Sequence, residues 1–227
     1  MALQVAADPY AFPCVGELTP DNTALLIIDM QFDFCAAEGY IGLMGYDIAP
    51  LRAPIEPIRE ARAAARKAGV HVLYTRQGYR ADLADMTAQK RWRSRQRGTP
   101  IEAGENRVLL RGAPGWQIIP ELAPSEGEAV IDKTANGAFY GTDLDNVLRA
   151  KGIRNIAFAG NTIDCCVHST LREADDRGYC CLLLADCCGA VDPELHRAAV
   201  AMVKVEGGVF GSVAMAEDFA AALQGLS

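Results

Sequence analysis

The 227-residue sequence lacks several features that would place it in a well-marked class of protein. It contains no run of about 18 apolar residues, so we expect no membrane-spanning helix. Its first segment, MALQVAADPYAFPC, has neither the basic start nor the long apolar stretch of a secretory signal, and we expect a cytoplasmic protein. The net charge of −7 disfavours nucleic acid as a partner.

Patterns for metal binding and for disulfide cross-linking are also scarce. The sequence has no C-x-x-C pair and only three histidines, so a zinc site is not expected. The eight cysteines include three adjacent pairs, an arrangement that is poor for cross-linking a fold: Cys165–Cys166, Cys180–Cys181 and Cys187–Cys188. We interpret most of these thiols as small buried hydrophobic side chains.

Half of the residues are hydrophobic, which is enough for one large core in a single domain over residues 1–227. Aliphatic runs alternate with helix-like stretches, and this predicts an α/β fold with a doubly wound, six-stranded, mostly parallel sheet flanked by helices. The expected strands are Thr23–Asp29, Val70–Thr75, Ala129–Lys133, Ile156–Gly160, Cys181–Ala185 and Gly208–Val213. The expected helices are Leu51–Ala68, Thr142–Lys151, Cys166–Arg177, Pro193–Val205 and Met215–Leu223.

Two segments lie outside this alternation. Residues 1–20 form an N-terminal extension, and residues 76–127 form a long polar connection without a strong strand. A connection of this length typically covers a pocket or contributes to a subunit interface. The basic run from Lys90 to Arg97 lies within it, and we interpret that run as a solvated or interface segment rather than a nucleic-acid site.

Three residues with charged or nucleophilic side chains follow buried strands. Asp29 ends the run TALLIID, Lys133 ends EAVIDK, and Cys166 comes shortly after NIAFAG. Because the carboxyl ends of parallel strands share one edge of the sheet, where ligands bind, we expect these side chains to meet in one pocket. An acid, an ammonium and a thiol in one pocket provide the groups for covalent thiol catalysis.

Each position also has a simpler explanation. An acid such as Asp29 often caps a loop, and a lysine such as Lys133 often extends to solvent. Cys166 lies at the expected start of a helix, whose N–H groups and dipole lower a thiol pKa and hold an oxyanion. Cys165 lies at the same expected helix start, so the same argument makes it a candidate nucleophile. Neighbours on a helix point about 100° apart, so only one of the two cysteines faces the reacting centre, and these arguments leave the choice open.

The segments LLIIDMQFDF and GNTIDCCVHST, with the lysine at the end of the middle strand, resemble the isochorismatase-like cysteine hydrolases. The resemblance extends from about Pro20 to the C-terminus. The signature of that family falls on Gly160, Asp164, Cys166 and Val167, and this register selects Cys166 as the nucleophile.

The resemblance implies a catalytic triad of Asp29, Lys133 and Cys166. It also implies a non-proline cis peptide bond between Asn161 and Thr162. The backbone N–H groups of Thr162 and Cys166 would then form the oxyanion hole.

Further segments point to one branch of the family. The segments DPY, GYIGLMGYDI, KRWRS, READDRGY, LADCCGA and GGVFGSV are together similar to biuret and triuret hydrolases. This similarity implies cleavage of the terminal C–N bond of triuret or biuret, without a metal or organic cofactor. Nicotinamidases carry an Asp-x-His metal site where this chain has TRQGYRAD, and isochorismatases proper lack the cysteine, so both are disfavoured. The alternatives that share the triad are hydrolysis of ureidoacrylate, of another N-carbamoyl amide, or of guanylurea.

Four residues are candidate substrate contacts: Glu206, Phe34, Tyr140 and Arg76. The biuret branch is expected to have glutamine where this chain has Glu206. A carboxylate only accepts hydrogen bonds, which suits a donor-rich substrate such as triuret or the cation guanylurea and disfavours ureidoacrylate. The other three residues are candidates by position alone.

The expected partners are a small-molecule substrate and further copies of the chain, because relatives in this family are commonly tetramers. No nucleic-acid or membrane partner is expected. An alternative hypothesis is that the chain is a phosphoacceptor signalling domain rather than a hydrolase, because such domains also place Asp and Lys at strand ends. Such a domain requires a cluster of acids to bind magnesium, whereas the first strand here ends with the single acid Asp29.

Overall fold

The computed structural model describes residues 3–99, 101 and 107–226. Its centre is a six-stranded parallel sheet with the strand order β3-β2-β1-β4-β5-β6. The strands are β1 (Thr23–Ile28), β2 (His71–Gln77), β3 (Ala129–Lys133), β4 (Asn155–Asn161), β5 (Cys180–Gly189) and β6 (Ser212–Ala214). The doubly wound α/β fold is confirmed, and its strands are all parallel.

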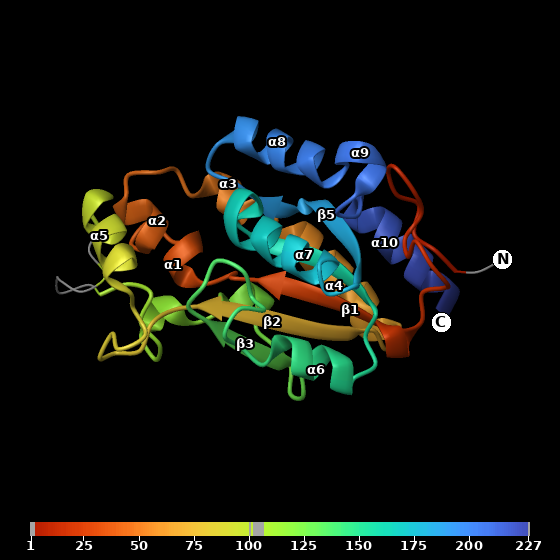
Figure 1. Cartoon of the computed structure of the whole chain (residues 1–227), viewed down its shortest axis with the longest axis horizontal. Helices are drawn as coiled ribbons and strands as arrows, with labels where there is room; N and C mark the ends of the chain where they lie inside the picture. The colour runs from red at the N-terminus through yellow and green to blue at the C-terminus, as the bar shows by residue number, and fades with distance from the viewer. Residues whose placement is uncertain (1–2, 100, 102–106, 227) are drawn as a thin grey trace.

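Helices cover both faces of the sheet (Figure 1). One face is covered by α4 (Ile55–Lys67) and α10 (Ala216–Leu223), and the other by α6 (Leu144–Ala150), α7 (His168–Asp175) and α8 (Pro193–Val203). The shorter helices are α1 (Phe32–Cys35), α2 (Tyr40–Leu43), α3 (Ala49–Arg52), α5 (Ala88–Gln96) and α9 (Val205–Gly208). Single helical turns are η1 (Pro20–Asn22), η2 (Pro114–Trp116), η3 (Pro120–Leu122), η4 (Ile163–Val167) and η5 (Gln224–Leu226).

Strand β1 is buried along its whole length and contributes to two separate cores. Leu25 and Ile27 pack in the cluster that includes α4 and α10. Ala24, Leu26 and Ile28 pack in the cluster that includes α6, α7 and α8. Successive side chains of a strand point to opposite faces, so a strand covered on both sides requires an unbroken aliphatic run.

The strand order reverses at the pair β1 and β4, at the centre of the sheet. Figure 1 shows the arrowheads of β1 and β2 pointing left, toward α1, α2 and α5, whereas both termini lie on the right. Ligands of doubly wound sheets bind at the carboxyl ends of the strands, at such a reversal. Asp29 follows β1 and Cys166 follows β4, so the fold places them on the two sides of this point.

The structure corrects several expected boundaries. The single helix expected from Leu51 to Ala68 is two helices, α3 and α4, because Pro54 lies between them and has no N–H to continue the first. The last strand begins at Ser212 rather than Gly208, since residues 205–208 form the turn α9. The connection 76–127 contains a regular helix, α5, that the sequence pattern did not predict.

The N-terminal extension packs at the amino ends of the strands. Val5 and Phe12 form an antiparallel bridge with each other, and Asp8 pairs with Val213 of β6. The Tyr10 hydroxyl donates a hydrogen bond to the carbonyl of Gly208 at 2.8 Å. The extension therefore fastens β6 and α9 at the edge of the sheet opposite Asp29.

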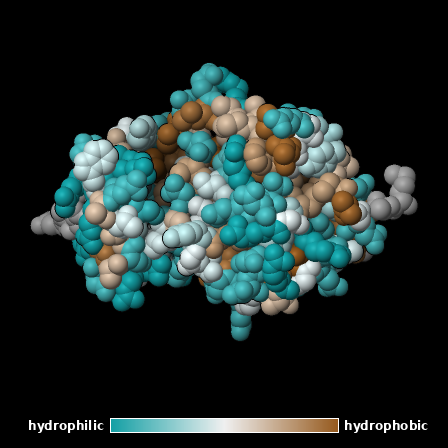
Figure 2. Space-filling view, viewed as in Figure 1, coloured by the Kyte–Doolittle hydropathy of each residue, from teal (hydrophilic) through white to brown (hydrophobic). Residues whose placement is uncertain are grey.

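The visible surface is mostly polar, with apolar patches over α8 toward the top of Figure 2. Exposed apolar side chains in this region include Leu195, Met202, Val205 and Val209. No helix in the described part of the chain is long and apolar enough to cross a bilayer. The expected tetramer stays a prediction.

Candidate active site

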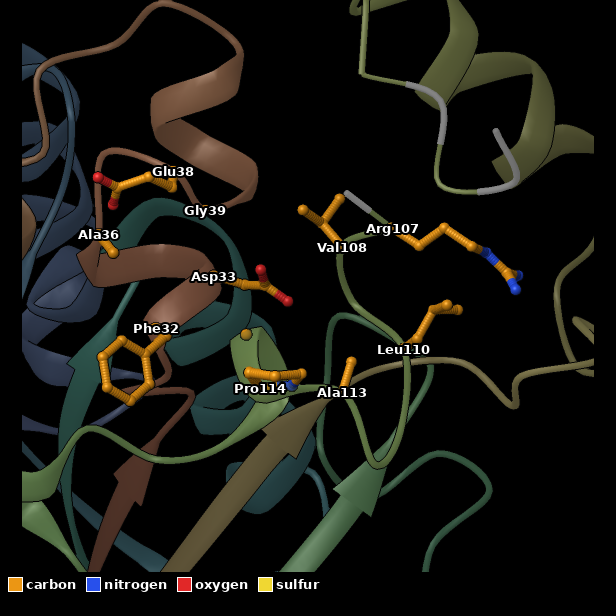
Figure 3. Close-up of a pocket in the computed structure, with 11 residues that line it drawn as sticks. Phe32, Asp33, Ala36, Glu38, Gly39, Arg107, Val108, Leu110, Ala113 and Pro114 are labelled. Atoms are coloured by element: carbon orange, nitrogen blue, oxygen red, sulfur yellow. The ribbon is translucent and has the colours of Figure 1, made fainter. Parts of the chain in front are cut away.

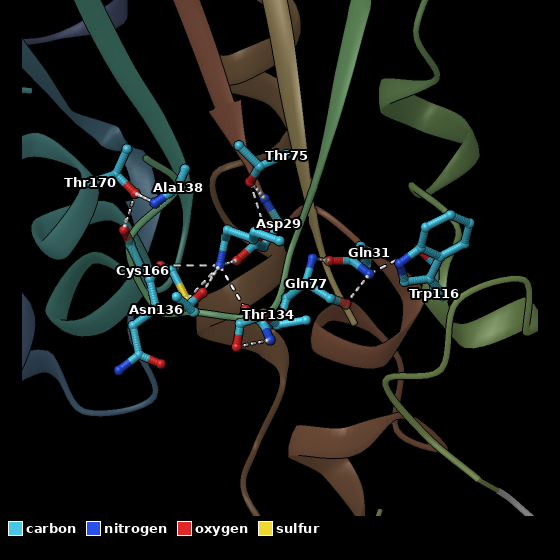
Figure 4. A network of polar contacts seen from close by, with 12 residues as sticks. Asp29, Gln31, Thr75, Gln77, Trp116, Thr134, Asn136, Ala138, Cys166 and Thr170 are labelled. Carbon is cyan, nitrogen blue, oxygen red and sulfur yellow. Dashed lines mark hydrogen bonds and ion pairs between the residues drawn. The ribbon is translucent and has the colours of Figure 1, made fainter. Parts of the chain in front are cut away.

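The acid Asp29 comes directly after β1, and its side chain is fully buried. Its backbone φ is 51°, a left-handed conformation that is uncommon outside glycine and recurs at functional sites. The Asp29 N–H donates to both the carbonyl and the hydroxyl oxygen of Thr75 in β2, each at 3.2 Å. The Thr75 hydroxyl donates to carboxylate Oδ1 at 2.6 Å. These contacts leave Oδ2 to face Lys133 (Figure 4).

Lys133 is the last residue of β3, and only 1% of its surface is exposed. Its Nζ lies 2.7 Å from Asp29 Oδ2 and 3.4 Å from Cys166 Sγ. Nζ also donates to the carbonyl oxygens of Ala135 and Asn136, each at 3.1 Å. An ammonium has three protons, so these acceptors together fix its position without solvent.

Cys166 lies in the π-helical turn η4 between β4 and α7. The Thr170 hydroxyl donates to the carbonyl of Cys166 at 2.7 Å and accepts the N–H of Ala138 at 3.1 Å. This bridge ties the turn to the segment that follows Lys133. The structure thus brings the three predicted residues together, because the Lys133 ammonium contacts both Asp29 and Cys166.

The charges of these groups depend strongly on one another. Burial by itself would lower the pKa of Lys133. The charges of Asp29 and Cys166 and their hydrogen bonds to the ammonium outweigh this effect, so the net pKa is raised and the ammonium stays charged. The pKa of Cys166 is raised by its hydrogen bond with Cys165 and by burial, and Lys133 opposes the shift. The lowered pKa expected from a helix N-terminus is therefore wrong for Cys166, which needs a base to become a nucleophile. The same hydrogen bond lowers the pKa of the half-buried Cys165 to about 7.

The expected cis peptide bond between Asn161 and Thr162 is present. The Thr162 carbonyl accepts the N–H groups of Cys165 and Val167, each at 3.1 Å. These bonds hold the turn that carries Cys166 next to the end of β4. The assignment of the Thr162 and Cys166 N–H groups to an oxyanion hole stays a prediction.

Two glutamines that the sequence pattern did not indicate, Gln31 and Gln77, lie side by side in the site (Figure 4), and Gln77 contacts Lys133. Gln77 Oε1 accepts a hydrogen bond from Lys133 Nζ at 2.8 Å, and Gln77 N–H donates to Gln31 Oε1 at 2.7 Å. Gln31 Nε2 in turn donates to the carbonyls of Gln77 and Trp116, at 3.0 and 2.8 Å. Gln31 therefore holds the backbone of Gln77, and the Gln77 side chain accepts the hydrogen bond from the ammonium.

A second ammonium, that of Lys90 in α5, also reaches this region. Its Nζ donates to the carbonyl of Thr134, the residue directly after Lys133, and lies 5.5 Å from the centre of the Tyr79 ring. Nearby, Arg97 donates to the Tyr40 hydroxyl at 3.1 Å. The segment KRWRS was the available signal, but the sequence analysis assigned its basic run to solvent or an interface.

Two of the candidate substrate contacts have other roles in the structure. Arg76 donates from Nε to Asp132 at 2.9 Å, and its guanidinium lies 3.5 Å from the centre of the Trp116 ring. It therefore links β2 to β3. Tyr140 is 72% exposed, in a segment held by a hydrogen bond from the N–H of Phe139 to Glu173 of α7. The structure does not bring either residue to the triad.

The other two candidates are placed differently. Phe34 is buried in α1, with its ring edge-on to that of Tyr40 at a centroid distance of 6.4 Å. Glu206 is exposed in α9, next to the Gly208 carbonyl that the N-terminal extension holds. This is the amino edge of the sheet, so within one chain the expected contact between Glu206 and substrate is not formed. Its φ of 53° sets the turn into β6.

A cavity of about 700 Å³ opens beside the site, between α1 and residues 107–115 (Figure 3). Its wall includes Phe32, Asp33, Arg107 and Gly115, and no triad residue. Asp33 Oδ2 accepts the N–H of Leu109 at 2.6 Å, and burial raises the pKa of this carboxyl. Gly115 leaves room for that carboxylate, since a Cβ there would lie 2.3 Å from Asp33 Oδ1.

Comparison with known proteins identifies the family. The isochorismatase domain matches residues 23–217, a range that covers most of the chain and includes Asp29, Lys133 and Cys166. The chain belongs to the isochorismatase family.

Curated members of the family with similar sequences are ureidoacrylate amidohydrolases named RutB. The protein from Acinetobacter baylyi is 32% identical over 94% of this chain and 86% of its own length. The one from Pseudomonas syringae pv. syringae is 33% identical over 96% and 90%. These relatives support the expected amidohydrolase acting on an amide C–N bond, and their name fits the alternative substrate ureidoacrylate better than the biuret and triuret branch.

Solved structures in the family share the fold. A cysteine hydrolase from Pseudomonas syringae pv. phaseolicola has a TM-score of 0.80 and 26% identity, covering 92% of this chain and 96% of its own. An N-carbamoylsarcosine amidase from Thermoplasma acidophilum has a TM-score of 0.65 and 25% identity, covering 86% and 97%. The chain is therefore an isochorismatase-family amidohydrolase with a complete acid–ammonium–thiol set.

Proposed function

We propose that this amidohydrolase cleaves the terminal C–N bond of a small linear ureide, foremost the condensed ureas triuret and biuret, through a covalent intermediate on Cys166. The observation that carries the proposal is the Lys133 ammonium in contact with both Asp29 and Cys166. The segments shared with biuret and triuret hydrolases support the choice of substrate. All three side chains are nearly closed to solvent, which favours a small, planar substrate.

The buried groups divide the reaction between them. Asp29 accepts the thiol proton while Lys133 stabilises the thiolate, and the sulfur attacks a terminal ureide carbonyl. The N–H groups of Thr162 and Cys166 hold the tetrahedral oxyanion. The protonated Asp29 then delivers its proton to the departing amino group, and ammonia leaves.

Water completes the turnover. Asp29 activates a water molecule, which cleaves the thioester-like bond and restores the thiol. Biuret gives allophanate and ammonia. Triuret gives ammonia and carboxybiuret, which loses carbon dioxide to give biuret.

Ureidoacrylate is the second candidate substrate, because the curated relatives are named for it. It carries the same terminal carbamoyl group as the condensed ureas, so the Cys166 thiolate attacks the same kind of carbonyl. Its carboxylate needs a cation nearby, and Lys90 lies next to the triad. Guanylurea is a weaker candidate substrate. The argument for it depended on a contact between Glu206 and the substrate, and a single chain does not form this contact.

The test measures ammonia release from triuret, biuret, ureidoacrylate and guanylurea at equal concentrations. We expect turnover of a condensed urea to be the fastest, and Cys166→Ser to abolish it. Cys14→Ser, which changes an exposed cysteine far from the triad, serves as the matched control and retains activity. Faster turnover of ureidoacrylate would favour the second candidate, and undiminished ammonia release by Cys166→Ser would overturn the mechanism.

A further inference from the structure

Lys90 extends from α5 into the polar interior beside the triad. Its side chain is half-buried, and its Nζ donates to the carbonyl of Thr134. The same carbonyl accepts Gln77 Nε2 at 3.3 Å, and Gln77 also binds Lys133. Lys90 and Lys133 therefore belong to one hydrogen-bond network, although they come from segments far apart in the sequence.

The placement differs from that of an ordinary surface lysine. Such a lysine lays its apolar stem on the protein and keeps its ammonium in water. Here the ammonium lies 5.5 Å from the centre of the Tyr79 ring and is linked to the Lys133 ammonium through the Thr134 carbonyl and Gln77. Burial and then the charge of Lys133 lower the pKa of Lys90, and the charges of Cys166 and Cys165 oppose this shift.

A partly desolvated ammonium next to another ammonium is favourable only when oxygen atoms surround it. Lys90 has three protons, and the carbonyl of Thr134 accepts one of them. A ureide that bonds to Cys166 through its terminal carbonyl has further oxygen atoms along its chain. These are carbonyl oxygens in a condensed urea and a carboxylate in ureidoacrylate.

We propose that Lys90 is a specificity-determining residue whose ammonium binds a substrate oxygen beyond the bond that is cleaved. This rests on the proposed function for the identity of the substrate. Lys90 selects neutral or anionic ureides with an oxygen at that position. It disfavours a ureide that ends in a guanidinium, because the two cations repel each other.

The first test needs no substrate and uses two alkylating reagents that differ in charge. Iodoacetate is an anion and iodoacetamide is neutral, so the ratio of their reaction rates at Cys166 reports the local positive charge. We expect Lys90→Met to lower this ratio about tenfold, and Lys90→Arg to keep it near the wild-type value. Lys67→Met, which removes an exposed lysine at the end of α4, is the matched control and leaves the ratio unchanged. Peptide mass spectrometry separates alkylation of Cys166 from that of its neighbour Cys165, and only the rates at Cys166 enter the ratio.

The second test measures steady-state turnover of the best ureide. We expect Lys90→Met to raise KM about tenfold while kcat changes less than about threefold, because the lost contact is distant from the reacting carbonyl. Lys90→Gln is a second variant, for use if Lys90→Met does not fold as judged by circular dichroism.

The two proposals fail in different ways. An unchanged alkylation ratio together with an unchanged KM in the Lys90 variants would overturn the role of Lys90 and leave the amidohydrolase intact. If the wild type hydrolyses no ureide, the proposed function fails, and the alkylation ratio alone then decides whether Lys90 acts on the site.

Discussion

Gln77 Oε1 accepts a hydrogen bond from the Lys133 ammonium at 2.8 Å, inside a site that is closed to water. Gln77 is oriented in turn by Gln31, so the direction of this bond is set by the backbone of β2. Gln77 is therefore a positioning residue. It keeps Lys133 between Asp29 and Cys166 without contacting the thiol.

We expect Gln77→Leu to lower kcat/KM about 10- to 100-fold, because a hydrogen bond to a buried charge contributes about 1.5–3 kcal/mol. The loss should fall mainly on kcat, since the ammonium is misplaced rather than the substrate. Steady-state ammonia release measures both constants. Gln96→Leu in α5, at an exposed position, is the matched control. Equal kcat for Gln77→Leu and the control would show that Lys133 needs no such support.

The triad was predictable because each of its residues lies at the end of a strand, directly after one, or in the short turn that follows one. Asp29, Lys133 and Cys166 follow aliphatic runs, and the parallel sheet alone brings such positions to one edge. Predicting that these three residues meet required only the position of each strand end, and not the direction in which a long side chain extends. The same reasoning correctly predicted a doubly wound, mostly parallel sheet, since alternating runs of this kind fold as βαβ units.

The supporting residues were not predictable in this way. Gln77 contacts Lys133 only because β2 continues two residues beyond the expected end at Thr75. Lys90 reaches the site because α5 folds back over Thr134, which a charge pattern does not show. Glu206 was expected in the pocket from the resemblance to biuret hydrolases, but it lies in α9, which precedes the short final strand β6. Each case depends on tertiary packing rather than local sequence.

Gly160 of β4 pairs with Ile28 of the neighbouring central strand β1. Its φ is 117°, and a Cβ at this position would lie 2.0 Å from the carbonyl oxygen of Ile28. We expect Gly160→Ala to lower the free energy of unfolding by at least about 3 kcal/mol, since the backbone of β1 cannot move away. Urea denaturation measures the change.

Gly127→Ala provides the control for backbone conformation alone. Gly127 also has a positive φ, of 84°, but nothing lies within 4 Å of its Cβ position. We expect a loss of only about 1–2 kcal/mol there. Similar losses at the two glycines would mean that the close approach to Ile28 is unimportant.

His168 makes stability depend on pH. Burial, and then the charge of Arg172, lower the pKa of this imidazole below its unfolded value of about 6.5. As the pH falls from about 7.5 to 5.5, the unfolded chain binds a proton at this histidine before the folded chain does, so the free energy of unfolding decreases. We expect His168→Asn, which keeps an acceptor for Arg172 Nε, to lose less stability over this interval. Urea denaturation at both pH values measures the difference, and identical losses in variant and wild type would contradict the assignment.

Cys14 of the N-terminal extension and Cys180 at the start of β5 have their sulfur atoms 2.8 Å apart, and both thiols are free. The N–H of Cys14 donates to Cys180 Sγ at 3.0 Å, which fixes the approach. Cys14 is exposed, whereas the pKa of Cys180 is raised to about 12, chiefly by burial. Attack by a thiolate on a small disulfide therefore begins at Cys14.

We expect oxidised glutathione to join Cys14 to Cys180, because the mixed disulfide formed on Cys14 lies within reach of the second sulfur. The reaction forms one protein disulfide, and two molecules of reduced glutathione carry away the electrons. The new bond would close most of the chain into a loop and raise the free energy of unfolding by up to about 4–5 kcal/mol. Non-reducing peptide mass spectrometry and urea denaturation measure these effects. Cys14→Ser should abolish both and Cys187→Ser neither, since Cys187 is buried on β5 away from this pair. Recovery of only singly glutathionylated Cys14 would show that the two sulfurs do not meet in the geometry needed for a bond.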